Sequence, residues 1–256
     1  MTEGFDASRP NIARVYNYWL GGGDNFAADR EQAEQLLRIY PGIADAVRAN
    51  RQFVGRAVTW AAREGIEQFI DLGAGLPASP SLHETARAVL PGAHVAYVDN
   101  DPVVISHVRA LLATGDGVTA VPGDLRDPAA VLASEALTEV IDMRRPVCAI
   151  LALVLHFSDA ATARAITAGY VSALAPGSCV VISVGGNDDP GGRVTAAYKA
   201  GTLHTHSREQ VAGFLAGLDL VEPGLSDART WRACWEEKPK LRPQAGYVLA
   251  AVGRKP

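Results

Sequence analysis

The sequence predicts an α/β domain with a mostly parallel sheet, helices on both faces and a helical cap at the N-terminus. After residue 66, short apolar runs alternate with stretches of helical periodicity, the pattern of repeated strand–helix–strand units. The run at residues 146–155 is almost continuously apolar, as expected for a central strand covered on both faces. We therefore expect residues 66–256 to form the sheet and residues 1–65 to form a cap within the same domain.

Length and composition are those of one folded domain. The 256 residues are 48% hydrophobic and 20% charged, enough to bury a sizeable core. The three cysteines, Cys148, Cys179 and Cys234, are odd in number and widely spaced, which favours free thiols in a reducing compartment. The net charge of −4 provides no basic surface for nucleic acid.

The chain lacks the signals of secretion and of membrane insertion. Its first residues contain neither a basic segment nor an apolar one, and no apolar segment approaches the ~20 residues of a spanning helix. We therefore expect a cytoplasmic protein that binds neither nucleic acid nor membrane. The oligomeric state is left open, a homodimer included.

Apolar spacing predicts three helices in the cap, over residues 12–20, 26–40 and 43–63. Gly21–Gly23 ends the first helix, and Asp24 or Asn25 is expected to cap the second. Three consecutive glycines are costly in backbone entropy and suit a backbone that bends closely around a ligand. The rings of Tyr16 and Trp19 could then cover a cation, although periodicity alone favours core packing for both.

The turn after the first predicted strand indicates the ligand class. Gly73–Ala78 formally matches the dinucleotide fingerprint, but a capping box at Ser81 and Glu84 makes the next helix begin late. A pyrophosphate needs a tight transition from glycine to helix, which is missing here. Asp71 would repel a pyrophosphate but attract a ligand that carries an ammonium and a sulfonium. These features favour S-adenosylmethionine over NAD.

The second predicted strand, at residues 93–98, ends on Asp99, Asn100 and Asp101. An acid at this strand end can accept hydrogen bonds from both ribose hydroxyls, and Asp99 is the better placed. Asp101, directly before a proline, fits the N-cap of the next helix.

A third acid follows the predicted strand at residues 118–121. Asp124 could accept a hydrogen bond from the adenine amino group, and Leu125 could lie against the base. Acids at three successive strand ends fit a cationic adenosyl ligand better than a doubly anionic dinucleotide. The central strand then brings Leu155 and His156 to the same edge, where His156 would face the reacting atoms or simply pack against the cofactor.

The C-terminal half completes the sheet and is expected to hold the acceptor. Strands are predicted at residues 178–184, 220–222 and 246–252, and helices at residues 128–143, 159–174 and 210–218. The glycine-rich loop at residues 185–192 could build an acceptor pocket or be a plain solvated loop. His204 and His206 lack further ligands at metal-binding spacing, so no metal is expected. Trp231 and Trp235 could rim a pocket or cover the sheet.

The run Arg14–Arg30 resembles the opening signature of a bacterial S-adenosyl methyltransferase family long catalogued only as a domain of unknown function. Members of that family read ARVYDYLLGGKDNFAADRE here, and this chain departs with Asn17, Trp19 and Gly23. The similarity extends over essentially the whole chain, including a similar LHF at Leu155–Phe157. The resemblance implies a Rossmann-like class I methyltransferase with a seven-stranded sheet.

The combined interpretation predicts a site for S-adenosylmethionine. The expected cofactor residues are Tyr16, Gly21, Gly22, Asp24, Asn25, Asp71, Gly73, Gly75, Asp99, Asn100, Asp124, Leu125 and Leu155. Because the sulfonium already activates the methyl group, positioning can supply most of the catalysis. If a general base is used, His156 is the first candidate and Tyr16 the second.

The methyl acceptor is expected to be a small molecule. The resemblance extends to enzymes of specialised metabolism, including indole-ring methylation, which implies an aromatic or indole-containing acceptor. Two alternatives stay open: a protein that binds the cofactor without catalysis, and, less favoured, an NAD(P)-dependent oxidoreductase.

Overall fold

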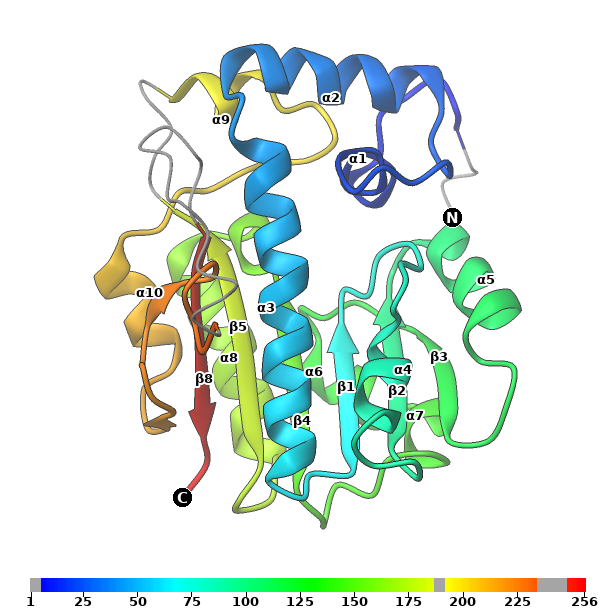
Figure 1. Ribbon diagram of the computed structural model, residues 1–256, viewed down its shortest axis with the longest axis vertical. Helices are drawn as coiled ribbons and strands as arrows, with labels where there is room; N and C mark the ends of the chain where they lie inside the picture. The colour runs from blue at the N-terminus through cyan, green and yellow to red at the C-terminus, as the bar shows by residue number, and fades with distance from the viewer. Residues whose placement is uncertain (1–5, 187–191, 234–247) are drawn as a thin grey trace.

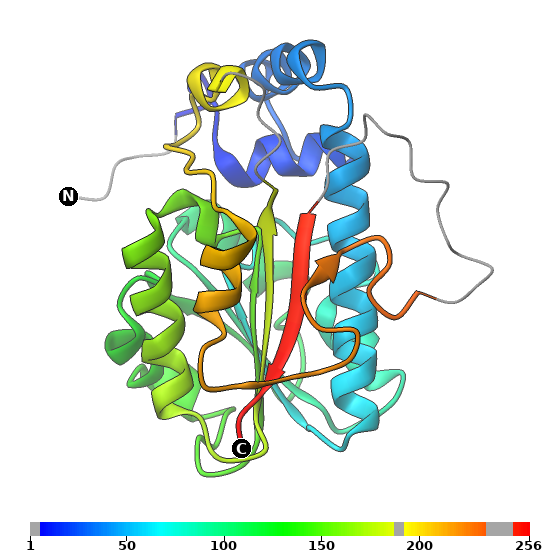
Figure 2. The ribbon, with the colours of Figure 1, turned by 90° about the vertical axis from the view of Figure 1, so that its left-hand side faces the viewer.

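A mixed, mostly parallel sheet with helices on both faces forms the centre of the computed structural model, which describes residues 6–186, 192–233 and 248–256 (Figures 1 and 2). The strands are β1 (Gln68–Leu72), β2 (His94–Asp99), β3 (Val118–Pro122), β4 (Val147–Ala152), β5 (Cys179–Gly185), β6 (Asp219–Leu220), β7 (Ser226–Asp227) and β8 (Val248–Arg254). Their order is β3-β2-β1-β4-β5-β8-β6, with β7 also paired to β8.

The predicted α/β class is confirmed, and the strand count differs slightly. Strands β1 to β5 pair in parallel, and β8 runs antiparallel between β5 and β6. The described residues give eight strands in place of the expected seven, because the two-residue strand β7 pairs with β8 from a stretch expected to be a loop. The carboxyl ends of the parallel strands therefore meet at one edge, as the site prediction requires.

The helices are α1 (Ile12–Trp19), α2 (Ala27–Ile39), α3 (Ile43–Arg63), α4 (Leu82–Arg87), α5 (Pro102–Leu111), α6 (Pro128–Leu132), α7 (Glu135–Thr138), α8 (Ala160–Ala173), α9 (Arg193–Ala197) and α10 (Arg208–Phe214), with the 3-10 helix η1 (Leu155–Phe157) after β4. Alternate strand residues face opposite layers: Phe69 packs in the core cluster that includes α3 and α5, and Ile70 packs in the cluster that includes α8 and α10. Figure 2 shows α3 and α8 on opposite sides of the sheet.

Several local predictions need correction. The single helix expected over residues 128–143 is two short helices, because Asp127 begins α6 and Ser134 begins α7 as N-caps. The N-cap of α2 is Phe26, not Asp24 or Asn25, since the carboxylate of Asp29 accepts the Phe26 N–H at 2.8 Å. Helix α9 lies in a stretch for which no helix was expected.

Two of the three cysteines and one of the last two tryptophans are buried in the core; the others lie outside the described residues. Cys148 and Cys179 are buried free thiols in register across β4 and β5. Trp231 is fully buried and packs edge-on against Phe53 with ring centroids 5.3 Å apart, so it covers the sheet. Cys234 and Trp235 lie outside the described residues, as does most of the glycine-rich loop.

The cap consists of α1, α2 and the upper part of α3, and Figure 1 shows it above the carboxyl edge of the sheet, with α9 beside α2. Helix α3 continues from the cap down one face of the sheet. The buried carboxylate of Asp29 joins α1 to α2: it accepts hydrogen bonds from Arg14 Nε at 2.7 Å and from the Asn11 N–H at 2.8 Å, besides its bond from Phe26. One carboxylate thus fixes the start of two helices.

Replacing this carboxylate should destabilise the protein. Asp29→Asn removes the charge that pairs with the buried guanidinium of Arg14, and breaking a buried ion pair in this way costs about 3–5 kcal/mol. Denaturant unfolding followed by circular dichroism measures the loss. Asp45→Asn is the matched control, because its ion pair with Arg48 is exposed and such pairs contribute about 0–1 kcal/mol. Equal losses in the two variants would contradict the structural role given to Asp29.

Candidate functional site

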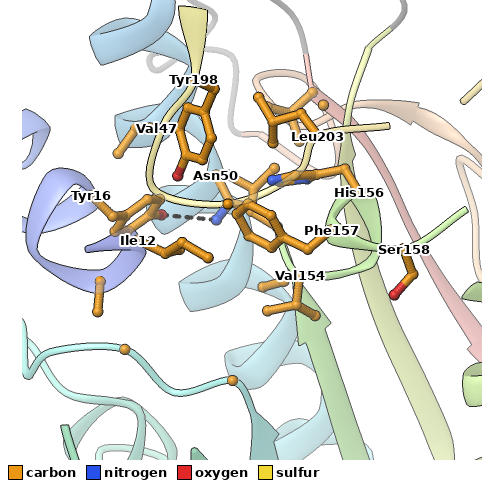
Figure 3. A pocket seen from close by; sticks show the side chains of 18 of the residues that line it. Ile12, Tyr16, Val47, Asn50, Val154, His156, Phe157, Ser158, Tyr198 and Leu203 are labelled. Atoms are coloured by element: carbon orange, nitrogen blue, oxygen red, sulfur yellow. Dashed lines mark hydrogen bonds between the residues drawn. The ribbon is translucent and has the colours of Figure 1, made fainter. Parts of the chain in front are cut away.

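A cavity of about 630 Å³ lies at the carboxyl ends of the parallel strands, beneath the cap. This volume is within the range of roughly 300–1,000 Å³ for pockets that bind small molecules. Figure 3 shows side chains from α1, α3, η1 and the segment after α9 converging there. The predicted residues that line the cavity are Tyr16, Asp71, Gly73, Gly75, Asp99, Asn100, Asp124, Leu125 and His156.

The turn after β1 is held open by glycine. Gly73 has a φ of +81°, and a Cβ atom built there would lie 2.5 Å from Val154 Cγ1 and 3.4 Å from Leu125 Cδ2. Its N–H donates to Val98 O at 2.8 Å, which ties the turn to the neighbouring strand β2. Residue 73 therefore has neither the backbone conformation nor the space for a side chain.

The acids at the ends of β1 and β2 are half-buried on the cavity wall. Burial raises the pKa of Asp71 to about 6, the guanidinium of Arg51 opposes this shift, and the charge of Asp99 adds to it. Burial also raises the pKa of Asp99, whose carboxylate accepts the N–H of Gly75 at 2.9 Å and that of Asp101 at 2.9 Å. The carboxylate of Asp99 is thus fixed in place, with one backbone bond to each oxygen.

The predicted N-cap role of Asp101 is confirmed, since its side chain accepts the Val103 N–H at 2.8 Å. The same carboxylate accepts Asn11 Nδ2 at 2.7 Å, and Asn11 in turn caps α1. The N-cap residue of α1, in the N-terminal helices, is therefore hydrogen-bonded to the N-cap residue of α5, which follows β2. Both residues line the cavity.

Asp124 and Leu125 lie where β3 leaves the sheet. Asp124 forms an ion pair with Arg126 at 2.5 Å, and this bond holds the pKa of Asp124 below its usual value. Leu125 faces the Gly73 turn. An ionised acceptor and an apolar side chain thus stand together at this corner of the cavity.

His156 belongs to η1, directly after the central strand. Burial lowers its pKa to about 4, with a smaller contribution from His206, so the imidazole is neutral at pH 7. Its Nδ1 is buried without a hydrogen-bond partner among the described residues, and its ring lies 4.4 Å from the ring of Phe157. A neutral imidazole therefore lies on the cavity wall, with its Nδ1 buried behind that wall.

The glycine run of the cap does not reach the cavity. Gly21, Gly22, Asp24 and Asn25 do not line it; Gly22, Asp24 and Asn25 contact the side chain of Asn17. Asn17 Oδ1 accepts the Asp24 N–H and Asn25 Nδ2, both at 3.1 Å, and a Cβ on Gly22 would lie 2.2 Å from Asn17 Nδ2. Close backbone approach does explain the glycine at position 22, but the approach is to a side chain of the protein.

The side chain of Leu155 also lies elsewhere. It is fully buried in the core cluster on the α8 face of the sheet, while its neighbours Val154 and His156 line the cavity. The single turn of η1 sends successive side chains in different directions, which a simple extension of the central strand does not predict.

The sequence interpretation missed several lining residues, among them Asn50 and Arg51 of α3. Val47 and Val54 line the cavity too, and the spacing 47, 50, 51, 54 places all four on one helical face. A polar pair within an otherwise apolar stripe was the available signal. Arg51 Nη2 donates to Ala78 O at 3.0 Å, which anchors the guanidinium beside the Gly73–Gly75 turn.

Comparison with known proteins identifies the chain. A model of the S-adenosyl methyltransferase family matches residues 1–256. The chain belongs to this family. It is accordingly an enzyme, an S-adenosylmethionine-dependent methyltransferase, as the opening signature predicted. No curated protein shows significant sequence similarity.

Solved structures of similar chains agree with this assignment. A DUF574 family protein from Streptomyces avermitilis is 34% identical, with a TM-score of 0.93 over 98% of this chain and 99% of that one. A putative methyltransferase from Thermobifida fusca is also 34% identical, with a TM-score of 0.91 over 98% and 96%. The fold is further shared with magnesium protoporphyrin IX methyltransferase from Synechocystis, solved with bound S-adenosylhomocysteine (14% identity, TM-score 0.58, coverage 94% and 93%).

The described residues contain neither a membrane-spanning helix nor a group of metal ligands. None of their helices is long and apolar enough to cross a membrane. In that same part of the chain, no three His, Cys, Asp or Glu side chains are grouped so as to bind a metal ion.

A side chain at position 73 should damage the turn after β1. In Gly73→Ala, the positive φ and the contact with Val154 each cost about 1–3 kcal/mol, so the free energy of unfolding should fall by about 2 kcal/mol or more. Thermal and denaturant unfolding measure this loss. Gly92→Ala is the control, because nothing lies within 4 Å of its built Cβ, and it should change stability by less than about 0.5 kcal/mol. An unchanged stability of Gly73→Ala would mean that the turn does not require glycine.

Proposed function

We propose that the cavity binds S-adenosylmethionine with its methionine half over Asp71, Gly73 and Gly75. Asp71 is a half-buried acid on the cavity wall, and no other described residue forms an ion pair with it, so a ligand ammonium would stabilise its ionised form. Gly73 and Gly75 line the cavity next to Asp71, so the backbone of the turn is open to the ligand there. When bound, this cofactor supplies a methyl group already activated by the sulfonium.

The nucleoside half would lie along the next two strand ends. Asp99 has one oxygen on each of two backbone N–H groups, which leaves both oxygens able to accept a further bond from a ribose hydroxyl. Asn100 lies beside it on the cavity wall. At the β3 corner, Asp124 would accept a hydrogen bond from the adenine amino group while Leu125 covers the ring.

We further propose that the methyl acceptor is a small aromatic metabolite, with an indole-containing compound as the leading candidate. The observation that carries this proposal is the aromatic wall of the cavity around His156. Phe157 and Tyr198 stand there with ring centroids 6.1 Å apart, and Trp19 and Tyr40 line the part beneath the cap. Flat aromatic molecules pack well against such side chains.

His156 is proposed to accept a proton from the methyl acceptor. A base with a pKa of about 4 is poorly suited to deprotonating a phenol of pKa about 10 before transfer, a step uphill by about 8 kcal/mol. It suits an aromatic carbon or ring nitrogen, which becomes strongly acidic only as the methyl group arrives. The neutral imidazole therefore favours C- or N-methylation over O-methylation.

Formation of S-adenosylhomocysteine in the presence of candidate acceptors tests this function. Indoles, other nitrogen heterocycles and simple phenols of similar size form the panel, and mass spectrometry locates the transferred methyl group. Turnover with indoles or nitrogen heterocycles in preference to phenols is expected. Preferred turnover of phenols would reject the proposed acceptor class while leaving the cofactor site intact.

His156→Ala should separate catalysis from cofactor binding. Turnover should fall by about 10²–10⁴-fold, the usual contribution of a general base, while affinity for S-adenosylhomocysteine stays within about twofold. His107→Ala serves as the control, because His107 lies on α5 and does not line the cavity. Unchanged turnover of the His156 variant would remove this residue from the mechanism.

Cofactor affinity should depend on pH through Asp71. The pKa of this carboxyl is raised to about 6, so below pH 6 the free protein holds it protonated and an ammonium ligand must displace that proton. Calorimetry should show affinity for S-adenosylhomocysteine falling by up to about tenfold per pH unit below pH 6.

Asp71→Asn is the matched variant for this measurement. It should bind more weakly at pH 7, and its affinity should change less between pH 7 and pH 5. The pKa of Asp99 is also raised, but this acid is present in both proteins, so the difference between the two curves reports Asp71. Parallel curves for the two proteins would show that Asp71 does not bind the ammonium.

A further inference from the structure

A chain of buried hydrogen bonds leads from the sheet to Tyr16 in the cap. Asn50 Nδ2 of α3 donates to the Tyr16 hydroxyl oxygen at 3.0 Å, the bond drawn in Figure 3. Ser183 Oγ of β5 donates to Asn50 Oδ1 at 2.6 Å, and the N–H of Leu153, just after β4, donates to Ser183 Oγ at 3.0 Å. Asn50 and Ser183 are almost completely buried, so this chain is shielded from solvent.

The direction of these bonds follows from their lengths and from the donors available. A separation of 2.6 Å is typical of O–H···O, and 3.0 Å is typical of N–H···O, which identifies the oxygen and the nitrogen of the Asn50 amide. The reversed amide would direct a second N–H at Ser183 Oγ. The Ser183 hydroxyl would then face an N–H in place of the amide oxygen to which it donates.

The consequence is that Tyr16 acts as a donor toward the cavity. Its oxygen already accepts the Asn50 N–H, so its own hydrogen is available to a molecule bound in the cavity. Burial raises the pKa of Tyr16, so the hydroxyl keeps its proton at neutral pH. A hydroxyl fixed in this way is unsuited to the role of general base.

The charges that act on the Tyr16 hydroxyl are those of Arg51 and Asp71. This end of the cavity therefore presents two hydrogen-bond donors, a hydroxyl and a guanidinium, beside the half-buried carboxylate of Asp71. A carboxylate and an ammonium on one carbon, the α-amino acid group, are complementary to that set.

We infer that Asn50 and Ser183 are positioning residues that orient Tyr16 to donate a hydrogen bond to the carboxylate of the cofactor's methionine half, next to Arg51. This inference rests on the proposed placement of S-adenosylmethionine and adds to it the recognition of the amino acid end. Tyr16 then binds the cofactor, and His156 alone is left to accept a proton. The relay also makes cofactor binding depend on β5, α3 and α1 being docked together.

Two ligands that differ only at the amino acid end test the inference. S-adenosylhomocysteine carries the carboxylate and the ammonium, whereas 5′-methylthioadenosine lacks both. Calorimetry with Tyr16→Phe should show affinity for S-adenosylhomocysteine about 10- to 100-fold below that of the unaltered protein, as expected for a lost hydrogen bond to a charged group. Affinity for 5′-methylthioadenosine should change by less than about twofold.

Variants of the two residues behind Tyr16 should act in the same direction, and Ser183 does so from outside the cavity lining. Ser183→Ala and Asn50→Leu should each lower the affinity for S-adenosylhomocysteine but not that for 5′-methylthioadenosine. The loss should be smaller than in Tyr16→Phe. Tyr18→Phe is the matched control on the same helix, since its hydroxyl bonds Glu34 on the exposed side and does not line the cavity. It should bind both ligands as the unaltered protein does.

Two outcomes would overturn the inference: unchanged affinity of Tyr16→Phe for S-adenosylhomocysteine, or an equal loss for both ligands, which would indicate a packing defect. Asp99→Ala distinguishes this failure from that of the proposed cofactor site. This variant should lower the affinity for both ligands, because both contain the ribose. If Asp99→Ala changes neither affinity, the proposed placement of the cofactor is itself wrong, whatever the behaviour of Tyr16→Phe.

Discussion

The turn after β1 depends on the absence of a side chain at residue 73, and the rest of the site is arranged around that constraint. The backbone lies against Val154 and Leu125 in a left-handed conformation and is held to β2 through the Val98 carbonyl. Two residues later, Gly75 donates its N–H to Asp99 and so fixes the acid of the next strand. The parallel sheet thereby brings segments from β1, β2 and η1 into contact at one edge.

Sequence patterns predicted this edge well because it follows from local rules. Strand ends, Asp-x-Gly-x-Gly and the caps at Ser81 and Asp101 are all determined by residues close together in the chain. Asp71, Asp99, Asp124 and His156 accordingly line one cavity. The prediction was weakest for the direction in which a side chain points. Leu155 was expected at the cofactor, but in the single turn of η1 its side chain points into the core.

The glycine run of the cap shows a second limit. The three glycines were expected to bend around a ligand, but Gly21 and Gly23 have open space where a Cβ would lie, and the close approach is at Gly22. The partner is Asn17, which precedes the run by one helical turn and gathers Asp24 and Asn25 around its amide. The sequence interpretation missed Asn50 because the role of this residue depends on its hydrogen bond with Ser183, which is 133 residues away in the chain. Contacts between residues so far apart in the chain depend on the topology of the fold, and the periodicity of the sequence does not predict topology.

The continuity of α3 has a consequence for how such an enzyme can diversify. The sheet edge that we assign to the cofactor is built from strand termini, whereas the far end of the cavity is closed by α1, α2 and the segment around α9. The roof therefore has two parts: Tyr16 of α1 is tied to α3 through Asn50, whereas the lining residues of α2 and of the segment around α9, such as Leu36 and Tyr198, are not part of that chain of hydrogen bonds. New acceptor preferences can therefore arise by changes in this second part, and the methyl-donor half is inherited intact.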